Sequence, residues 1–336
     1  MSKIDALFIT PPSRLDVYQG LSNEYAAIEQ PVWSSLTATY LMNRNYNVQI
    51  LDAEAENLTH DQTAEKILSI EPRLAIFMVY GQQPSASTQC MPGGKKTCDK
   101  LNNLSSNSIK TIVVGTHASA LPKKTLEEEP YDFVCQGEGT HTLQALLQMD
   151  DLDNSSQLDS VPGLWHRKDG QPFFNRPAPV IPEKELAVTL NGVAWDMLPM
   201  DNYRAHNWHC FDHINDRTPY ATLYTSLGCP FKCSFCCINA PFGKPSIRYW
   251  DPDFVITDKE AIQENPPDIL LTNYKMLDYL LMRPEDQALW KDNRPETLRY
   301  IVLDELHTYD GVQGGDVACL LRRLRAKLKA EDGAIT

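Results

Sequence analysis

The sequence predicts an α/β fold in which a doubly wound parallel sheet occupies the first 150 residues. Short runs rich in β-branched and aromatic residues alternate there with amphipathic segments of helical period. Strands separated by helical crossovers form a parallel sheet with helices on both faces. The expected strands are residues 4–10, 47–53, 74–80, 111–116 and 132–137, and the expected helices include residues 32–45, 61–70 and 142–149.

Length, charge and cysteine content narrow the class of protein. The chain has 336 residues, enough for two domains and a further fragment. The net charge of −13 argues against a general polyanion-binding surface, so nucleic acid is not an expected partner. No run approaches about 20 apolar residues, so no membrane span is expected. Nine cysteines without a signal peptide indicate metal or redox chemistry in the cytoplasm rather than disulfides.

The segments that follow the expected strands form a candidate ligand edge. Ligands on doubly wound sheets bind beyond the carboxyl ends of the strands. The residues at these ends, 11–13, 81–88, 115–122 and 136–142, are mostly small or hydroxyl-bearing, so a bulky ligand could approach the backbone. PGGKKT (92–97) does not fit a phosphate-binding loop, and we interpret it as a turn inside a helical connection.

Three motifs of this edge resemble those of a known domain. Pro-Pro follows the first strand, G-x-H-x-x-x-L-P the fourth and Gly-Glu-Gly the fifth. In this order they resemble the flavodoxin-like cobalamin-binding domain of cobalamin-dependent radical S-adenosylmethionine enzymes. No D-x-H-x-x-G ligand motif is present, and the resembled family commonly holds cobalamin without one. A flavodoxin-like domain with another ligand, or with none, is the alternative. By this resemblance the cobalamin contacts are Pro11, Ser85, Ser87, Thr88, Gly115, Thr116, His117, Gly137, Glu138 and Gly139.

The most specific chemical pattern is the loop SLGCPFKCSFCC at residues 226–237, preceded by an expected strand at 218–228. Cys229, Cys233 and Cys236 stand in a C-x3-C-x2-C spacing, which supplies three soft thiolate donors on one tight loop. This spacing, with Phe235 before the last cysteine, resembles the signature of the radical S-adenosylmethionine superfamily. The resemblance implies that the three thiolates hold a [4Fe–4S] cluster, which cleaves S-adenosylmethionine, with Phe235 near the adenine. A structural zinc site completed by a distant histidine is the alternative.

A connector is expected over residues 151–218, where turn-rich segments predict a small hairpin and then an extended strap. Residues 194–208 also resemble the linker that leads into the radical core of the same family. His206, His209, Cys210 and His213 match no usual zinc spacing, and their aromatic neighbours favour packing.

After residue 256 the expected radical core does not continue. LLTNYKMLD (270–278) and RYIVLDELH (299–307) resemble consecutive motifs of a superfamily 2 helicase of the DEAD/DEAH-box type, so residues 257–336 resemble a βαβα fragment of its RecA-like domain. In such a motor Asp304 would orient Mg²⁺ and Glu305 the attacking water. An ordinary strand followed by an acidic loop is the alternative. The basic run at 320–329 predicts a surface helix.

These patterns predict a cobalamin domain, a connector, the truncated start of a radical barrel at 219–256 and a partial helicase domain. The expected cofactors are cobalamin, S-adenosylmethionine and a [4Fe–4S] cluster, with an electron donor as partner and an unknown substrate. Turnover is expected to be low or absent, because the substrate-enclosing part of the core and a phosphate-binding loop are both missing from the sequence. A helicase fragment and a non-catalytic cobalamin-binding module are the alternatives. Gene rearrangement, a recombined reading frame and an assembly artefact are open explanations for the join.

Overall fold

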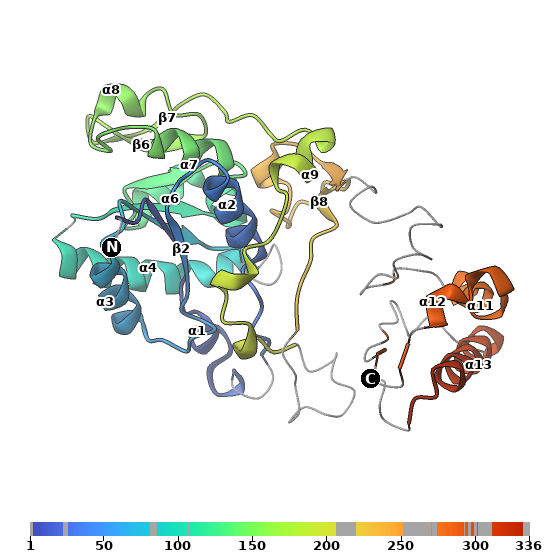
Figure 1. Ribbon diagram of the computed structural model, residues 1–336. Helices are drawn as coiled ribbons and strands as arrows, with labels where there is room; N and C mark the ends of the chain where they lie inside the picture. The colour runs from blue at the N-terminus through green and yellow to red at the C-terminus, as the bar shows by residue number, and fades with distance from the viewer. Residues whose placement is uncertain are drawn as a thin grey trace. The chain divides into compact units, whose positions relative to one another are not determined.

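The fold was analysed in a computed structural model of the chain, shown in Figure 1. It divides into two compact units, Met1–Trp250 and Asp251–Thr336, which we describe separately. The structure describes residues 3–22, 26–80, 86–106, 108–205, 220–250, 270, 274–291, 293–294, 297–298, 301 and 311–331. His206, His209, Cys210, His213, Asp304 and Glu305 lie outside these ranges.

Unit 1 is built on a seven-stranded, mostly parallel sheet with the strand order β2-β1-β3-β4-β5-β6-β7. The five parallel strands are β1 (Ala6–Thr10), β2 (Val48–Asp52), β3 (Leu74–Met78), β4 (Lys110–Val114) and β5 (Phe133–Cys135). Each lies within an expected strand or is offset from it by one residue. Their order is that of a doubly wound flavodoxin-like sheet, so the predicted fold class is confirmed.

Helices cover both faces of this sheet because successive strand residues point to opposite sides. Phe8 and Ile76 join one buried cluster with α2 and α7, whereas Ile9 and Phe77 join another with α3 and α4. The helices of this domain are α1 (Arg14–Tyr18), η1 (Gln19–Leu21), α2 (Val32–Met42), α3 (His60–Ile70), α4 (Ala86–Ser105), α5 (Thr116–Ala120), α6 (Pro122–Glu128) and α7 (Thr140–Leu147).

The predicted hairpin of the connector is β6 (Leu164–Lys168) with β7 (Gln171–Phe174), and it extends the sheet antiparallel to β5. A separate two-stranded sheet pairs β8 (Ser226–Cys229) with β9 (Ser246–Tyr249). β8 is shorter than the strand expected at 218–228, because β9 supplies pairing partners only for residues 226–229. Short helices complete the connector and the loop after β8: α8 (Ser155–Leu158), η2 (Glu183–Glu185), α9 (Leu186–Thr189), η3 (Trp195–Met197), η4 (Met200–Asn202) and η7 (Ala240–Phe242).

The prediction of a turn at residues 92–97 is wrong, because these residues lie inside the continuous helix α4. The two glycines permit close packing of α4 instead. A Cβ atom at Gly93 would lie 2.5 Å from the Pro12 carbonyl oxygen, and one at Gly94 would lie 2.5 Å from the Tyr131 hydroxyl. The sequence PGG therefore brings α4 against the segment that follows β1.

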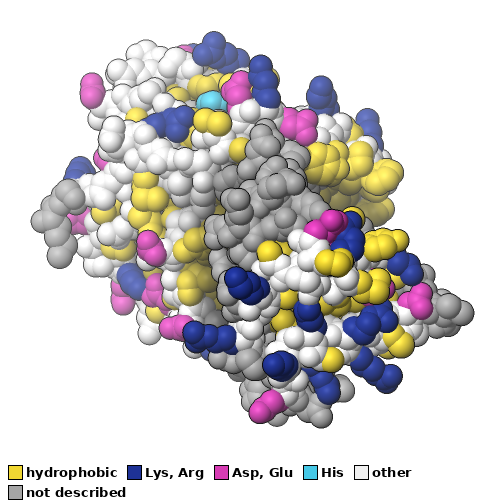
Figure 2. Space-filling model, turned by 45° about the vertical axis from the view of Figure 1, so that its right-hand side comes forward, with side chains coloured by type: hydrophobic (Ala, Val, Ile, Leu, Met, Phe, Trp, Pro, Cys, Tyr) yellow, Lys and Arg dark blue, Asp and Glu magenta, His cyan; other side chains and the backbone are white. Residues whose placement is uncertain are grey.

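The described residues of unit 2 form helices α11 (Tyr274–Met282), η9 (Pro284–Asp286), α12 (Ala288–Lys291) and α13 (Gly311–Leu328). Leu281 of α11 packs against Leu320, Leu324 and Leu328 of α13. The basic residues of α13 from Arg322 to Lys327 are exposed, as is Lys329 just after the helix, which confirms the predicted surface helix. Figure 2 shows lysine and arginine side chains interspersed with hydrophobic ones on one face of the molecule.

We predict that Gly93→Ala lowers the free energy of unfolding by about 1–3 kcal/mol, because the new methyl group overpacks against Pro12. The matched control is Gly20→Ala, where nothing lies within 4 Å of the added atom. Its expected change is below about 0.5 kcal/mol. Urea unfolding followed by circular dichroism measures both variants, and equal stabilities would contradict the close approach.

Candidate functional site

A cavity lies where the strand order reverses, between the carboxyl ends of β1 and β3. This topological switch point is where doubly wound sheets bind ligands. The cavity has a volume of about 270 Å³. Its walls come from the ends of both strands, from the starts of α2 and α4, from residues 27–30 and from the segment before β8; they include Pro11, Glu29, Trp33, Tyr80, Gln89 and Tyr224.

A charged pair fixes the loop after β1 at the floor of this cavity. One Glu54 carboxylate oxygen accepts hydrogen bonds from the backbone N–H groups of Ser13 (2.7 Å) and Arg14 (2.8 Å). The other oxygen accepts the Arg14 Nε–H at 3.2 Å, and Arg14 also donates to the Ser22 carbonyl. These two charges compensate one another, so the pair presents little net charge to a ligand. The Trp33 and Tyr80 rings, with centroids 5.7 Å apart, add an aromatic wall.

The predicted cobalamin contacts fall into three groups. Pro11 lines the cavity. A second group gathers where α4 begins and β4 ends: the Ser87 hydroxyl donates to the Val79 carbonyl and accepts the His117 backbone N–H at 3.1 Å. Thr88, Thr116 and Gly115 also belong to this group. The Thr88 hydroxyl lies 2.9 Å from His117 Nδ1, and Thr116 is buried. A Cβ atom at Gly115 would lie 2.1 Å from the Val79 carbonyl oxygen. Ser85 lies outside the described residues.

Burial and the nearby Lys124 cation set the protonation state of His117. Because burial lowers the pKa of this histidine below its usual value, the imidazole is neutral at pH 7. A neutral ring paired with the Thr88 hydroxyl is an uncharged polar surface. It can accept or donate one hydrogen bond without adding a cation to the site.

The third group is the Gly-Glu-Gly segment after β5. Gly137 and Gly139 have φ angles of +139° and +95°, which favour glycine. The Gly137 N–H donates to the Ser119 hydroxyl at 3.2 Å. Glu138 between them is 2% exposed, and its backbone carbonyl accepts the Trp33 indole N–H at 2.9 Å. The segment is thereby held against α2.

The Glu138 carboxylate is at the centre of a buried ring of hydrogen bonds. One of its oxygens accepts from Arg248 Nη2 at 2.6 Å and the other from the Ile181 N–H at 2.7 Å. Arg248 Nη1 donates to the Ile181 carbonyl at 2.5 Å and closes the ring. Burial raises the pKa of Glu138, and the Ile181 N–H and Arg248 act in the opposite direction. The ring joins the sheet domain, the strap and β9.

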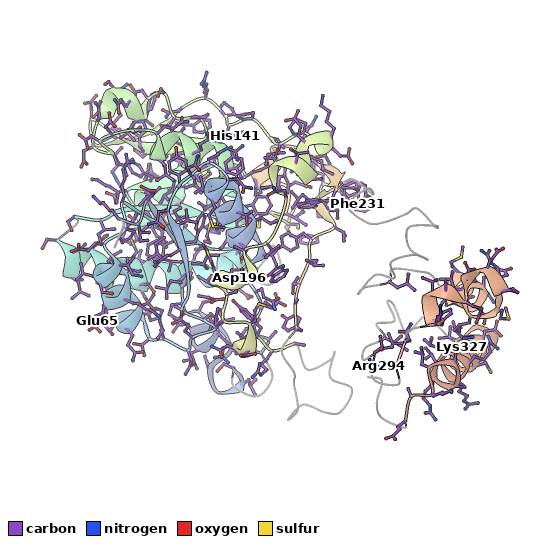
Figure 3. The ribbon with its side chains drawn as sticks, in the orientation of Figure 1. Glu65, His141, Asp196, Phe231, Arg294 and Lys327 are labelled. Atoms are coloured by element: carbon purple, nitrogen blue, oxygen red, sulfur yellow. The ribbon has the colours of Figure 1, made fainter. Side chains whose placement is uncertain are left out.

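The cysteine loop leaves β8 through Gly228, whose φ of +88° and close approach to the Ser246 carbonyl require glycine. Asn239 clamps the loop that follows. Its side-chain oxygen accepts the Cys229 N–H and its amide nitrogen donates to the Phe231 carbonyl, both at 3.0 Å. Figure 3 shows Phe231 at the edge of unit 1, and this side chain is 70% exposed.

The donor chemistry of this loop fits an iron–sulfur cluster. Cys233 and Cys236 are exposed and Cys229 is half-buried, so these thiols are accessible to a ligand. In the part of the chain that the structure describes, no three His, Cys, Asp or Glu side chains are gathered around a metal position. Phe235 is 88% exposed. The loop therefore supplies three thiols of the kind that bind an iron–sulfur cluster. That the three thiols converge on one cluster stays a prediction.

The connector is held against the same edge of the sheet. The buried Asp52 at the end of β2 accepts hydrogen bonds from the Tyr203 hydroxyl (2.9 Å) and the Ala55 N–H (3.1 Å). Burial raises the pKa of Asp52 to about 7. The Gln30 side chain donates to the Tyr220 carbonyl, close to the cavity residues Thr222 and Tyr224. The Gln30 contact brings segments separated by 190 residues to one cavity.

Several residues of the site were not anticipated from the sequence, namely Glu29, Glu54, Asn239 and Arg248. Asn239 follows Cys236 in a turn-prone stretch. Because asparagine in such a stretch often bonds to nearby backbone groups, its position could have predicted these hydrogen bonds. Arg248 lies on an ordinary alternating strand, so nothing local marks it as buried. Only contacts with residues 67 and 110 positions away explain its burial.

Comparison with known proteins supports the first domain most strongly. Residues 18–147 match the family described as the B12 binding domain. An uncharacterised methyltransferase of Pyrococcus horikoshii is 29% identical over 206 residues, which cover 61% of this chain and 40% of the relative. An uncharacterised ATP-dependent helicase of Methanocaldococcus jannaschii is 31% identical over 77 residues, which cover 23% of this chain and 11% of the relative.

A solved structure shares the fold at low sequence identity. The radical S-adenosylmethionine methyltransferase TsrM from Kitasatospora setae, solved with cobalamin and a [4Fe–4S] cluster, aligns with a TM-score of 0.53 at 14% identity. The alignment covers 96% of this chain and 57% of TsrM. This chain therefore spans only part of the length of each of the three relatives. No helix in the described ranges is both long and apolar enough for a bilayer span.

We predict that Arg248→Met lowers the free energy of unfolding of unit 1 by about 3–5 kcal/mol, because it leaves the buried Glu138 carboxylate without its cation. Adding Glu138→Gln to this variant should recover part of the loss, since the amide carries no charge. The control Lys124→Met breaks an exposed i,i+4 pair and should change stability by less than about 0.5 kcal/mol. Urea unfolding measures all three, and similar losses in Arg248→Met and Lys124→Met would contradict the role of the ring.

Proposed function

We propose that the first domain binds cobalamin at the switch-point cavity and that the cysteine loop holds a [4Fe–4S] cluster that acts on S-adenosylmethionine. The observation that carries the proposal is the coincidence of two independent features. The B12 binding domain match spans residues 18–147, and the cavity lies at the switch point of that same sheet. The aromatic wall formed by Trp33 and Tyr80 suits a large planar ligand.

Each group of residues has a role in this proposal. Pro11, Trp33 and Tyr80 would provide apolar contact area, and Ser87, Thr88 and His117 would provide neutral hydrogen-bonding groups. Cys229, Cys233 and Cys236 would ligate three irons, and Asn239 would fix the backbone that carries them. A cluster bound there would supply the electron that cleaves S-adenosylmethionine. Phe235 would pack against the adenine.

We propose low or no turnover for this chain. A radical core requires further βα units to enclose a substrate, and the elements described in residues 274–331 are helices. Methyl transfer is the reaction class that the names of two of the relatives suggest. Cobalamin binding without cleavage of S-adenosylmethionine to 5′-deoxyadenosine would instead indicate a non-catalytic cobalamin module.

A second proposal concerns the origin of the C-terminal residues. We infer that residues 257–336 derive from a helicase motor domain, an inference that the similarity of 77 residues of this chain to the M. jannaschii helicase supports. Motor activity is not part of this proposal, because the sequence contains no phosphate-binding loop that could position nucleotide for Asp304 and Glu305. Independent genomic reads across codons 250–270 test whether one gene encodes both parts.

We predict that the full chain binds methylcobalamin in the dark and that Gln89→Trp weakens this binding at least tenfold, or about 1.4 kcal/mol. Gln89 lies exposed at the cavity wall, so an indole there would fill the cavity without disturbing the core. The matched control Asn103→Trp places the same side chain at an exposed position further along α4 and should bind normally. Equilibrium dialysis measures the dissociation constants. Equal affinities of the two variants would remove this cavity as the site.

We predict that anaerobic reconstitution loads about four irons per chain and gives the EPR signal of a reduced [4Fe–4S] cluster. Cys229→Ala, Cys233→Ala and Cys236→Ala should each lose most of the iron, because the cluster needs three thiolate ligands. Cys237→Ala, from the same loop, and Cys319→Ala, on α13, should retain it. Iron retained in all of the first three variants, or zinc bound in preference to iron, would contradict the cluster assignment.

A further inference from the structure

Glu29 is a carboxyl group of the cavity that carries no assigned role. It lies three residues before Val32, the first residue of α2, and next to Ile28, which forms an antiparallel bridge with Arg204 of the connector. Its half-buried side chain lines the cavity. Among the described residues, no hydrogen bond or ion pair engages the Glu29 carboxyl group. By contrast, the other carboxylate of this cavity, Glu54, is bonded to Ser13 and Arg14.

The surroundings of Glu29 favour an uncharged carboxylic acid. Among the described residues, the charged and titratable groups that face it or share its cavity are Tyr18 of α1, Tyr80 after β3, Tyr220 and Tyr224 before β8, Cys90 of α4, and the mutually paired Arg14 and Glu54. None of these is a free cation. Burial raises the pKa of Glu29 to about 7, and burial likewise raises the pKa of Tyr224 to about 12. The acid is therefore protonated below neutral pH and ionised above it.

We propose that protonated Glu29 binds a primary carboxamide of the ligand in the switch-point cavity. This inference rests on the proposed function, because the corrin ring of cobalamin carries primary carboxamides at its periphery. A carboxylic acid donates its O–H to the amide carbonyl and accepts the amide N–H on its other oxygen. An ionised carboxylate can only accept, so it would leave the amide carbonyl oxygen facing a negative charge.

The opposite preference would follow if the cavity received a cationic ligand. In that case the ionised carboxylate would bind more tightly, and affinity would rise with pH. The two cases therefore predict opposite changes of ligand affinity with pH.

The test is the dissociation constant of methylcobalamin, kept in the dark, for the full chain at pH 6 and pH 8. Affinity should fall about tenfold between these values, because the protonated fraction of Glu29 falls by that factor. Glu29→Gln should bind at both pH values as the unsubstituted chain does at pH 6, since an amide donates and accepts at any pH. Glu65→Gln, an exposed residue of α3 labelled in Figure 3, is the matched control and should keep the original pH dependence.

Three outcomes would overturn the assignment. They are an affinity that does not change with pH, an affinity that rises with pH, and a pH dependence that persists in Glu29→Gln; the last would point to Asp52 or His117 instead. In each of these cases cobalamin still binds, so the proposed function survives. Absence of binding at both pH values would overturn the proposed function together with this assignment. Circular dichroism at each pH establishes that the variants are folded.

Discussion

The buried ion pair between Arg248 and Glu138 is the interaction on which the arrangement of unit 1 most depends. A charge removed from water must find a partner, and each of these residues finds the other together with the backbone of Ile181. The three residues come from the strand after the cysteine loop, the segment after β5 and the connector. The position of the cysteine loop relative to the sheet domain is therefore set by hydrogen-bond geometry rather than by apolar contact alone.

The cavity also depends on contacts between residues that are far apart in the sequence. The sheet and its loops provide most of its lining at the switch point, and Thr222 and Tyr224 from the segment before β8 complete its walls. Asp52 holds Tyr203, and Gln30 holds the backbone at Tyr220, so the residues that cover the cavity are anchored beside the strands that define it. Isolated residues 1–150 would lack Thr222 and Tyr224 and would present a more open edge. A ligand bound in the cavity would contact both the sheet domain and the segment before β8.

The elements that could be predicted are those whose formation depends on the residues of the element itself. The five parallel strands follow from runs of apolar residues whose alternate members enter the two clusters on opposite faces. The hairpin β6–β7 follows from its turn residues. The segment 92–97 was misread because Pro and Gly are usually turn residues, whereas in α4 the glycines serve the contact of the helix with Pro12 and Tyr131. Local propensity was overridden there by packing.

The doubly wound sheet, the edge of the sheet where the cavity lies and the three thiols on one loop could be predicted from the sequence, because periodicity and spacing are local properties of the chain. The folded structure was needed to show that Glu138 pairs with Arg248, that Asn239 bonds to the cysteine loop and that Glu29 lines the cavity with no hydrogen-bond partner among the described residues. The partners of these side chains come from turns, strands and loops that fold against one another. Burial and pairing depend on that folding, and residue spacing does not encode them.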